Sequence, residues 1–272
     1  INHGAQLNKA DNDGVTPAWM ACQKGHTECL SLLINHGAQL DKADNEGCTP
    51  AYIACQNGHT ECLSLLINHG AQLDKADDTG TTPAYIACQN GHTECLSLLI
   101  NHGAQLDKAN NEGATPAHIA CQNGHTECLS LLINHGAQLD KASNTGVTPA
   151  YTACGNGHPE CMSLLINHGV DCSKTADNGS GPIHIACQNG HFECVKALLD
   201  RGKVDVNCTT INRQTPAIFC CMTGHVKILQ LLIQHGADMS LADTMRGSSP
   251  AHMASAYGRV KILPLIKKVN AD

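Results

Sequence analysis

One stretch of sequence recurs along this chain almost without change. Residues 47–76 read GCTPAYIACQNGHTECLSLLINHGAQLDKA; residues 80–109 differ from them at one position and residues 113–142 at two. A Thr-Pro pair marks the same place in successive copies and returns every 33 residues, at Pro17, Pro50, Pro83, Pro116 and Pro149. A fixed period of this length is typical of a repeat array, in which each unit buries its apolar face against its neighbours.

The repeat unit 44–76 predicts two helices joined by turns. Thr49 can cap the first helix, Pro50 suits its first position, and Gly58 ends it. Thr60 is a candidate cap for a second, longer helix. The apolar face of that helix consists of Cys62, Leu63, Leu65, Leu66 and Ile67. The sequence after this helix predicts an extended, turn-rich link to the next unit.

The order Gly-x-Thr-Pro, Ala-Cys-x-x-Gly-His-x-Glu-Cys and Leu-Leu-Ile-x-x-Gly-Ala resembles the ankyrin repeat, and the resemblance extends over essentially the whole chain. It implies an all-α repeat solenoid of antiparallel helix pairs, with β-hairpin-like loops projecting from the stack. Loop tips and first helices then form a concave face, the usual partner-binding face. We expect a single domain over residues 1–272. Its parts are the tail of a preceding repeat at 1–10, repeats at 11–43, 44–76, 77–109, 110–142, 143–175, 176–209 and 210–243, and a C-terminal cap at 244–272.

Composition narrows the classes of function. The formal net charge is −7, and no strongly basic run is present, which argues against nucleic-acid binding. No apolar run is long enough for a transmembrane helix, and no signal peptide is recognisable, so direct membrane insertion is not expected. The 17 cysteines mostly repeat in two apolar slots, which indicates reduced, inward-facing thiols and a cytoplasmic or nuclear protein.

The copies differ mainly at two places, which are candidate partner-binding positions. One is the loop tip, where the candidates are Asn45, Glu46, Asp78, Thr79, Asn111, Glu112, Asn144 and Thr145. The other is the residue two after the proline, where the candidates are Trp19, Tyr52, Tyr85, His118, Tyr151 and His184. A ladder of rings resembles an interaction hot spot. The alternative is that each ring fills the space beside an alanine that stands where the ankyrin pattern has leucine.

Two polar features can be interpreted either as partner-binding groups or as solvated surface without a binding role. The amides of Gln56, Asn57, Gln89 and Asn90 lie toward the concave groove by ankyrin geometry and could bind an extended peptide, or they are solvated helix ends. The loop-tip differences could equally be drift in solvated turns.

A Cys-x3-His-x2-Cys spacing recurs in the repeats and invites a zinc interpretation, because Cys and His are the preferred ligands of zinc. The glycine between them turns the chain, so we expect the two cysteines in the inter-helix core and no metal site. A second histidine ladder, which starts at His3 and His36, is expected to be a set of helix-end residues, or else a surface that charges near pH 6. No catalytic motif and no cofactor-binding motif is present.

The sequence therefore predicts a non-catalytic interaction scaffold, adaptor or peripheral subunit that binds a helix or extended segment of another protein, without a small-molecule substrate. The alternative is a targeting region of a larger multidomain protein, such as a ligase, kinase or channel subunit, whose active part lies outside these residues. A third hypothesis is a thiol- or metal-responsive sensor.

Overall fold

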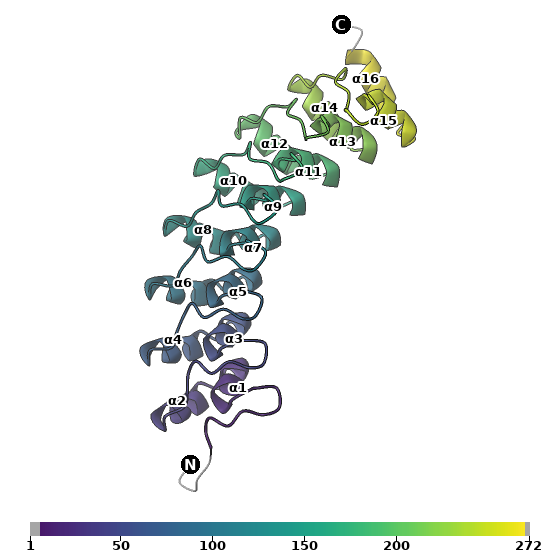
Figure 1. Cartoon of the computed structure of the whole chain (residues 1–272). Helices are drawn as coiled ribbons and strands as arrows, with labels where there is room; N and C mark the ends of the chain where they lie inside the picture. Colours follow the sequence, from purple (N-terminus) through teal and green to yellow (C-terminus); the bar gives the residue numbers. More distant parts are fainter. Residues whose placement is uncertain (1–5, 270–272) are drawn as a thin grey trace. The chain divides into compact units, whose positions relative to one another are not determined.

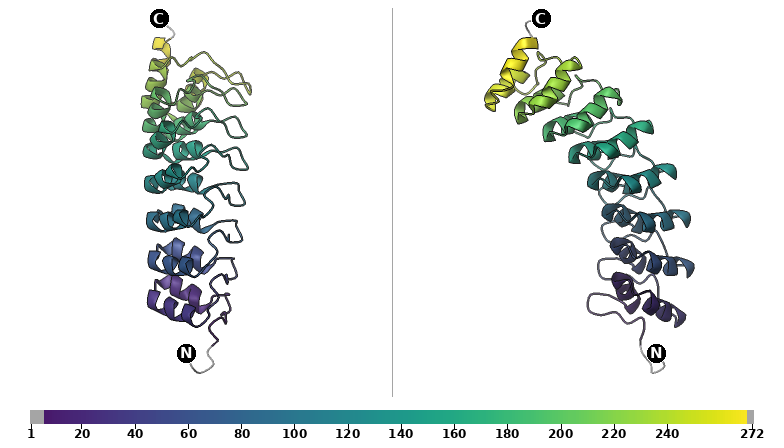
Figure 2. Two further views of the ribbon diagram at one scale, coloured as in Figure 1. Left: turned by 90° about the vertical axis from the view of Figure 1, so that its left-hand side faces the viewer. Right: turned by 180° about the vertical axis from the view of Figure 1, so that it is seen from behind.

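The computed structural model describes residues 6–269, and in that range the chain forms sixteen helices and no strand (Figure 1). The predicted all-α fold is confirmed. Within each repeat an inner helix is followed by an antiparallel outer helix, and a hairpin loop precedes the inner helix (Figure 2). Residues 1–5 of the predicted preceding repeat, with His3, lie outside the described range.

The chain divides into two compact units, residues 1–138 and 139–272, where the repeat count predicts one array. A stack of repeats has no single core, because each repeat contacts only its neighbours, and it therefore separates into shorter compact parts.

In the first unit the inner helices are α1 (Pro17–Lys24), α3 (Pro50–Asn57), α5 (Pro83–Asn90) and α7 (Pro116–Asn123), and the outer helices are α2 (Thr27–Asn35), α4 (Thr60–Asn68), α6 (Thr93–Asn101) and α8 (Thr126–Asn134). In the second unit the inner helices are α9 (Pro149–Asn156), α11 (Pro182–Asn189), α13 (Pro216–Thr223) and α15 (Pro250–Ala256), and the outer helices are α10 (Pro159–Asn167), α12 (Phe192–Asp200), α14 (Val226–Gln234) and α16 (Leu263–Val269).

The inner helices begin and end where the sequence predicts. In α3 the Thr49 hydroxyl accepts a hydrogen bond from the Tyr52 amide at 3.1 Å, and Pro50 occupies the first position. Gly58 ends the helix with φ of 72°, a left-handed conformation that costs glycine little. The outer helix starts differently from expectation, because His59 is its N-cap residue and no side chain caps it. The predicted Thr60 cap is therefore wrong.

The core of the first unit is built from small inner-helix residues and aliphatic outer-helix residues. Ala54 and Cys55 of α3 and Leu63 and Leu66 of α4 are fully buried, and the copies in α5 to α8 repeat this pattern. Small inner-helix side chains allow close approach of neighbouring repeats, and the aliphatic side chains then fill the remaining volume. Burial of this kind supplies the main favourable free energy of the stack.

Repeated thiols lie inside this interface, as the sequence predicts. Cys62 is buried and lies 3.7 Å from the Thr27 hydroxyl of the preceding repeat, and Thr60 and Cys95 repeat the contact at 3.7 Å. Every cysteine in the chain is a free thiol. The hydroxyl that was expected to cap the outer helix therefore makes a contact between repeats.

Imidazole and amide groups also join neighbouring repeats at the inner-helix ends. His92 and Asn90 both donate to the Gln56 carbonyl oxygen of the preceding repeat, at 3.1 Å and 2.8 Å. The His92 ring lies against Gly58, where an added Cβ would be 2.7 Å from Nδ1. Glycine is thus required at this position by its backbone conformation and by the ring packed against it.

Two glycines of the third repeat separate these two requirements. Gly91 has φ of 73°, and an added Cβ would lie 2.7 Å from His125 Nδ1, whereas Gly103 has φ of 80° with nothing within 4 Å. Gly103→Ala is expected to lower the free energy of unfolding by about 1 kcal/mol, the cost of the left-handed backbone alone. Gly91→Ala is expected to cost roughly 2 kcal/mol because the imidazole must also move. Urea unfolding of both variants measures the difference, and equal losses would contradict the packing role of His125.

The last repeat departs from the regular hairpin. In the first repeats the hairpin closes with a bond such as Asp44 N to Cys48 O, and in the last repeat the bond runs from Asp243 N to Ser248 O. The last hairpin therefore begins at residue 243, one earlier than the sequence count placed it, and is one residue longer. Helix α16 begins at Leu263, so Pro264 lies in its first turn, where no intrahelical donor is lost.

Candidate protein-interaction surface

Within each unit the hairpin tips are exposed and hydrogen-bonded from one repeat to the next. In the first unit Asn45 N donates to Asp13 O at 3.0 Å, and Asn111 N donates to Thr79 O at 2.8 Å. All eight tip candidates are exposed: Asn45, Glu46, Asp78, Thr79, Asn111, Glu112, Asn144 and Thr145. The tips are thus accessible to a partner while their backbones are fixed by neighbouring repeats.

The second and third hairpins are also held from within by their first residues. The carboxylate of Asp44 accepts hydrogen bonds from the amides of Glu46 at 3.0 Å and Cys48 at 2.8 Å. Asp77 does the same for Thr79 and Thr81, at 2.9 Å and 2.8 Å. These side-chain contacts stabilise tight turns. The exposed side chains at the tips are therefore presented on a preorganised backbone, which lowers the entropic cost of binding.

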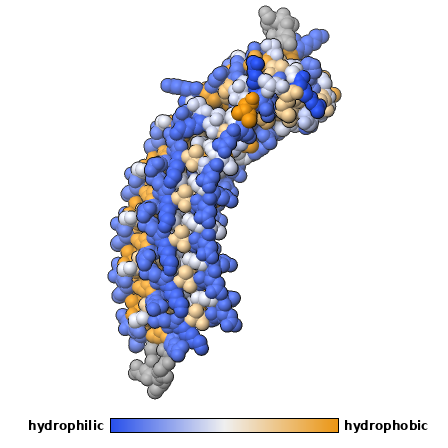
Figure 3. All heavy atoms as spheres, in the orientation of Figure 1, coloured by the Kyte–Doolittle hydropathy of each residue, from blue (hydrophilic) through white to orange (hydrophobic). Residues whose placement is uncertain are grey.

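Charge and apolar surface lie on different sides of the first unit. Figure 3 shows the hairpin side as hydrophilic and an apolar stripe over the outer helices α2 to α8. The tips carry the carboxylates of Asp13, Glu46, Asp78 and Glu112. The stripe includes Leu32, which is 54% exposed, and the half-buried Leu65 and Leu98.

The six ring positions do not form an exposed strip. Tyr52 is 6% exposed and Tyr85 is 7%, and Trp19, His118 and His184 are buried as well, whereas Tyr151 is half-buried. The expectation of an exposed strip is corrected: the rings lie between the helices and the hairpins, beside the small alanines. Trp19 Nε1 donates to the Cys48 carbonyl oxygen of the next hairpin at 3.1 Å. Burial, with Asp77 close by, raises the pKa of the Tyr52 hydroxyl.

The amide candidates contribute mainly to contacts within the stack. Asn57 Nδ2 donates to Ile53 O of its own helix at 2.9 Å, whereas Asn90 Nδ2 donates to Gln56 O of the preceding repeat. The side chain of Gln56 is exposed and that of Gln89 is half-buried. Asn90 thus ties neighbouring inner-helix ends together, and the side chain of Gln56 remains accessible.

The histidine and cysteine ladders have structural partners. The turn histidines His59, His92 and His125 bond to carbonyl oxygens of the preceding repeat at 3.1 to 3.2 Å. At helix ends, His36 Nδ1 donates to Leu32 O at 2.8 Å. Among residues 6–269, no cluster of His, Cys, Asp and Glu has the geometry to hold a metal ion.

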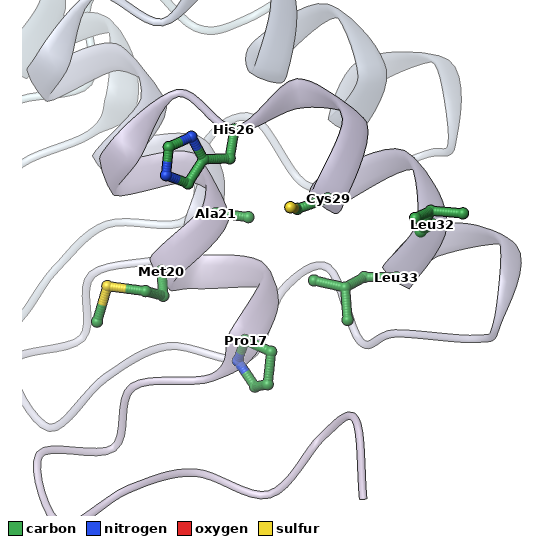
Figure 4. A pocket seen from close by; sticks show the side chains of 7 residues that line it. All are labelled: Pro17, Met20, Ala21, His26, Cys29, Leu32 and Leu33. Atoms are coloured by element: carbon green, nitrogen blue, oxygen red, sulfur yellow. The ribbon is translucent and has the colours of Figure 1, made fainter. Parts of the chain in front are cut away.

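One surface was not anticipated from the sequence. At the exposed side of the first repeat, Met20, Cys29, Leu32 and Leu33 surround an open apolar hollow (Figure 4). Ile53, Cys62 and Leu66 take the positions of Met20, Cys29 and Leu33 in the second repeat, and they are buried by the first. The hollow therefore has the residue pattern through which neighbouring repeats pack against each other.

Burial protects the thiols inside the stack. Fifteen of the seventeen cysteines are buried, among them Cys62 and Cys95. We expect these two thiols to react slowly with a reagent such as dithionitrobenzoate in the native protein and fast after unfolding in urea. Fast labelling of Cys62 or Cys95 in the native protein would contradict this burial.

Antiparallel helix pairs with a projecting hairpin, stacked through small inner-helix residues, define the class of helical repeat proteins. The family model for ankyrin repeats (three copies) matches residues 1–77, 72–143, 136–210 and 183–272, so the chain belongs to the ankyrin-repeat family. Among solved structures, the human ASB11 ankyrin repeat domain is similar, with a TM-score of 0.73 and 23% sequence identity over 82% of this chain and 99% of that chain. The comparison with curated proteins found no match.

Ankyrin repeats are generally protein-interaction modules, and the fold is typically non-catalytic. No helix within the described range is long and apolar enough to cross a membrane.

Proposed function

We propose that this chain is a non-catalytic interaction scaffold or adaptor that binds another protein through its hairpin tips and the adjoining inner-helix surface. The observation that carries the proposal is the row of exposed tips. Repeats that are otherwise near-identical differ in their tip side chains while the tip backbones keep the same hydrogen bonds. Such a surface changes its chemistry from repeat to repeat without changing its shape, as recognition of a specific partner requires.

The polar residues of the tips support recognition by a protein segment. Asp78, Thr79, Asn111 and Glu112 provide acceptors and donors on a fixed backbone, and Gln56 is accessible on the inner-helix side. An extended segment or a helix that crosses several repeats can contact one tip in each. The buried rings are not part of this proposed surface.

Site-specific photo-crosslinking tests the proposal. A photoreactive amino acid is placed at Asp78 or at Glu112 on the tips, and at Glu61 or Glu94 on the outer helices as matched exposed controls. Incubation with native extract and irradiation should give discrete cross-linked proteins from the tip positions and not from the control positions. The same products from all four positions, or products from the outer helices alone, would contradict the proposal.

A further inference from the structure

The hairpin tips of the last two repeats carry exposed apolar side chains. Ile211 is 69% exposed and Met245 is 68% exposed. The tips of the first five repeats carry mainly Asp, Asn, Glu and Thr, for example Asn45 and Glu46 in the position of Ile211 and its neighbour. Neither Ile211 nor Met245 adds to the core, so a role in folding does not account for them.

A backbone outlier lies beside Ile211. Arg213 has φ of 58°, in the left-handed region, at the position where Gly47 and Gly80 close the earlier hairpins. A side chain with a Cβ is disfavoured in this conformation, and glycine would remove the strain. Strained residues of this kind occur often at functional sites, where the side chain is needed for contact.

The two tips are joined, so their side chains share one surface. Thr244 N donates to Asn212 O at 2.9 Å, which links the two hairpins directly. At Gly179 an added Cβ would point at Ile211 N, 2.6 Å away in the following hairpin. Arg213 occupies the same turn position one repeat later. The bond between Thr244 and Asn212 therefore holds the turn of Arg213 next to the hairpin that carries Met245 and Arg246.

The second of these tips is longer and rigidly held. The Asp243 carboxylate accepts hydrogen bonds from the amides of Arg246 at 3.0 Å and Ser248 at 3.1 Å. This carboxylate is buried and bound to its own turn. Arg213 and Arg246 are both exposed, and neither forms an ion pair within residues 6–269. We call Ile211, Arg213, Met245 and Arg246 the arginine tips.

We propose that the arginine tips bind an acidic, extended segment of a partner protein, with an apolar side chain of that segment packed on Ile211 and Met245. The proposal rests on the interaction function above and assigns a partner chemistry to one part of the surface. The positive charge of Arg213 and Arg246 favours an acidic partner segment, because neither arginine has a carboxylate partner in the part of the chain that the structure describes. The tips of the first four repeats, in contrast, are themselves acidic. Arginine is also well suited to carboxylates, which it can bind with two parallel hydrogen bonds.

A nucleic acid is the other polyanion to consider. Nucleic-acid binding depends on many phosphate contacts, and this surface has two arginines on a chain with a formal net charge of −7. The exposed apolar pair also has no role in phosphate contact. A protein segment therefore fits this surface better.

The test uses the whole chain and a fluorescein-labelled twelve-residue peptide in which leucine alternates with glutamate and aspartate. Fluorescence anisotropy should show saturable binding that weakens with added salt. R213E/R246E is expected to weaken binding by about tenfold or more, as reversal of two contact charges implies. I211N/M245T, which introduces polar residues like those of the other tips, is expected to weaken it several-fold. E61Q, at an exposed position of the outer helix α4, is the matched control and should have no effect.

Arg213→Gly separates a binding role from a structural one. Because glycine relieves the backbone strain, this variant should melt at the same temperature as the wild type or higher, yet bind the peptide more weakly. Unchanged peptide binding in R213G and R213E/R246E would overturn the proposal. So would equal binding of a matched lysine-containing peptide or of a single-stranded oligonucleotide. The photo-crosslinking at Asp78 and Glu112 reports on the general interaction function separately, so each proposal can fail without the other.

Discussion

A chain with both Tyr52→Ala and Tyr85→Ala is expected to lose much of the stability of its second and third repeats. Each ring is buried between an inner helix and the hairpins, so its removal leaves a cavity that the helices cannot fill without moving. Removal of a buried aromatic ring costs roughly 3–5 kcal/mol, and the two costs need not add, because the rings lie in neighbouring repeats.

Hydrogen exchange is the suitable measurement for the double variant, because a repeat array need not unfold in one step. Amides of α3 to α6 should lose protection, while those of the second unit keep theirs. Tyr85→Phe is the matched control: it keeps the ring and should cost less than about 1 kcal/mol. Unchanged protection together with lost partner binding would show that the rings act at an interface after all.

Acid is expected to destabilise the second unit through His184. This imidazole is buried beside the Phe219 ring, with centroids 5.8 Å apart, and its Nε2 lies 3.9 Å from the Cys208 sulfur. Nδ1 accepts a hydrogen bond from Gly181 N at 3.1 Å, and Nε2 donates to Cys208 O at 3.1 Å. Protonation would place a donor at Nδ1 opposite the Gly181 donor. Burial lowers the pKa of His184 to about 4.

The sign of the pH dependence follows from this depressed pKa. Above about pH 6.5 the imidazole is neutral in both states and its contribution to stability is complete. Between about 6.5 and 4 the unfolded chain binds a proton that the folded chain excludes, so stability falls by about 3 kcal/mol. Urea unfolding of wild type and His184→Gln across this range checks the expectation. A wild-type slope that persists in the variant would assign the acid sensitivity to other groups.

Much of this fold could be predicted from the sequence, because the signals are local and repeated. Thr49 and Pro50 begin a helix and Gly58 ends it through backbone preferences that do not depend on the rest of the chain. The inward-facing Cys and Leu positions follow from helical periodicity. The Thr60 cap was predicted from the same kind of local signal and is wrong, because His59 takes the cap position and the hydroxyl meets Cys95 of the next repeat.

The candidate surface was predictable only in part. Tip residues such as Glu46 and Asp78 are exposed because short turns leave their side chains no interior to enter. A ring two positions after the proline is compatible with an exposed strip of rings and with rings that fill the space beside the alanines. Which of the two arrangements forms depends on the size of the space between repeats, and the order of residue types does not specify that distance.

The sequence by itself determined the repeat, its helix ends, its family and the polar tips, since each follows from local backbone preference or from the period of 33 residues. Tertiary structure decided which side chains are enclosed between repeats. Tyr52 and Tyr85 are buried, because the neighbouring repeats approach closely enough to cover both rings. Burial in a stack is a property of neighbours, and neighbours exist only once the chain has folded.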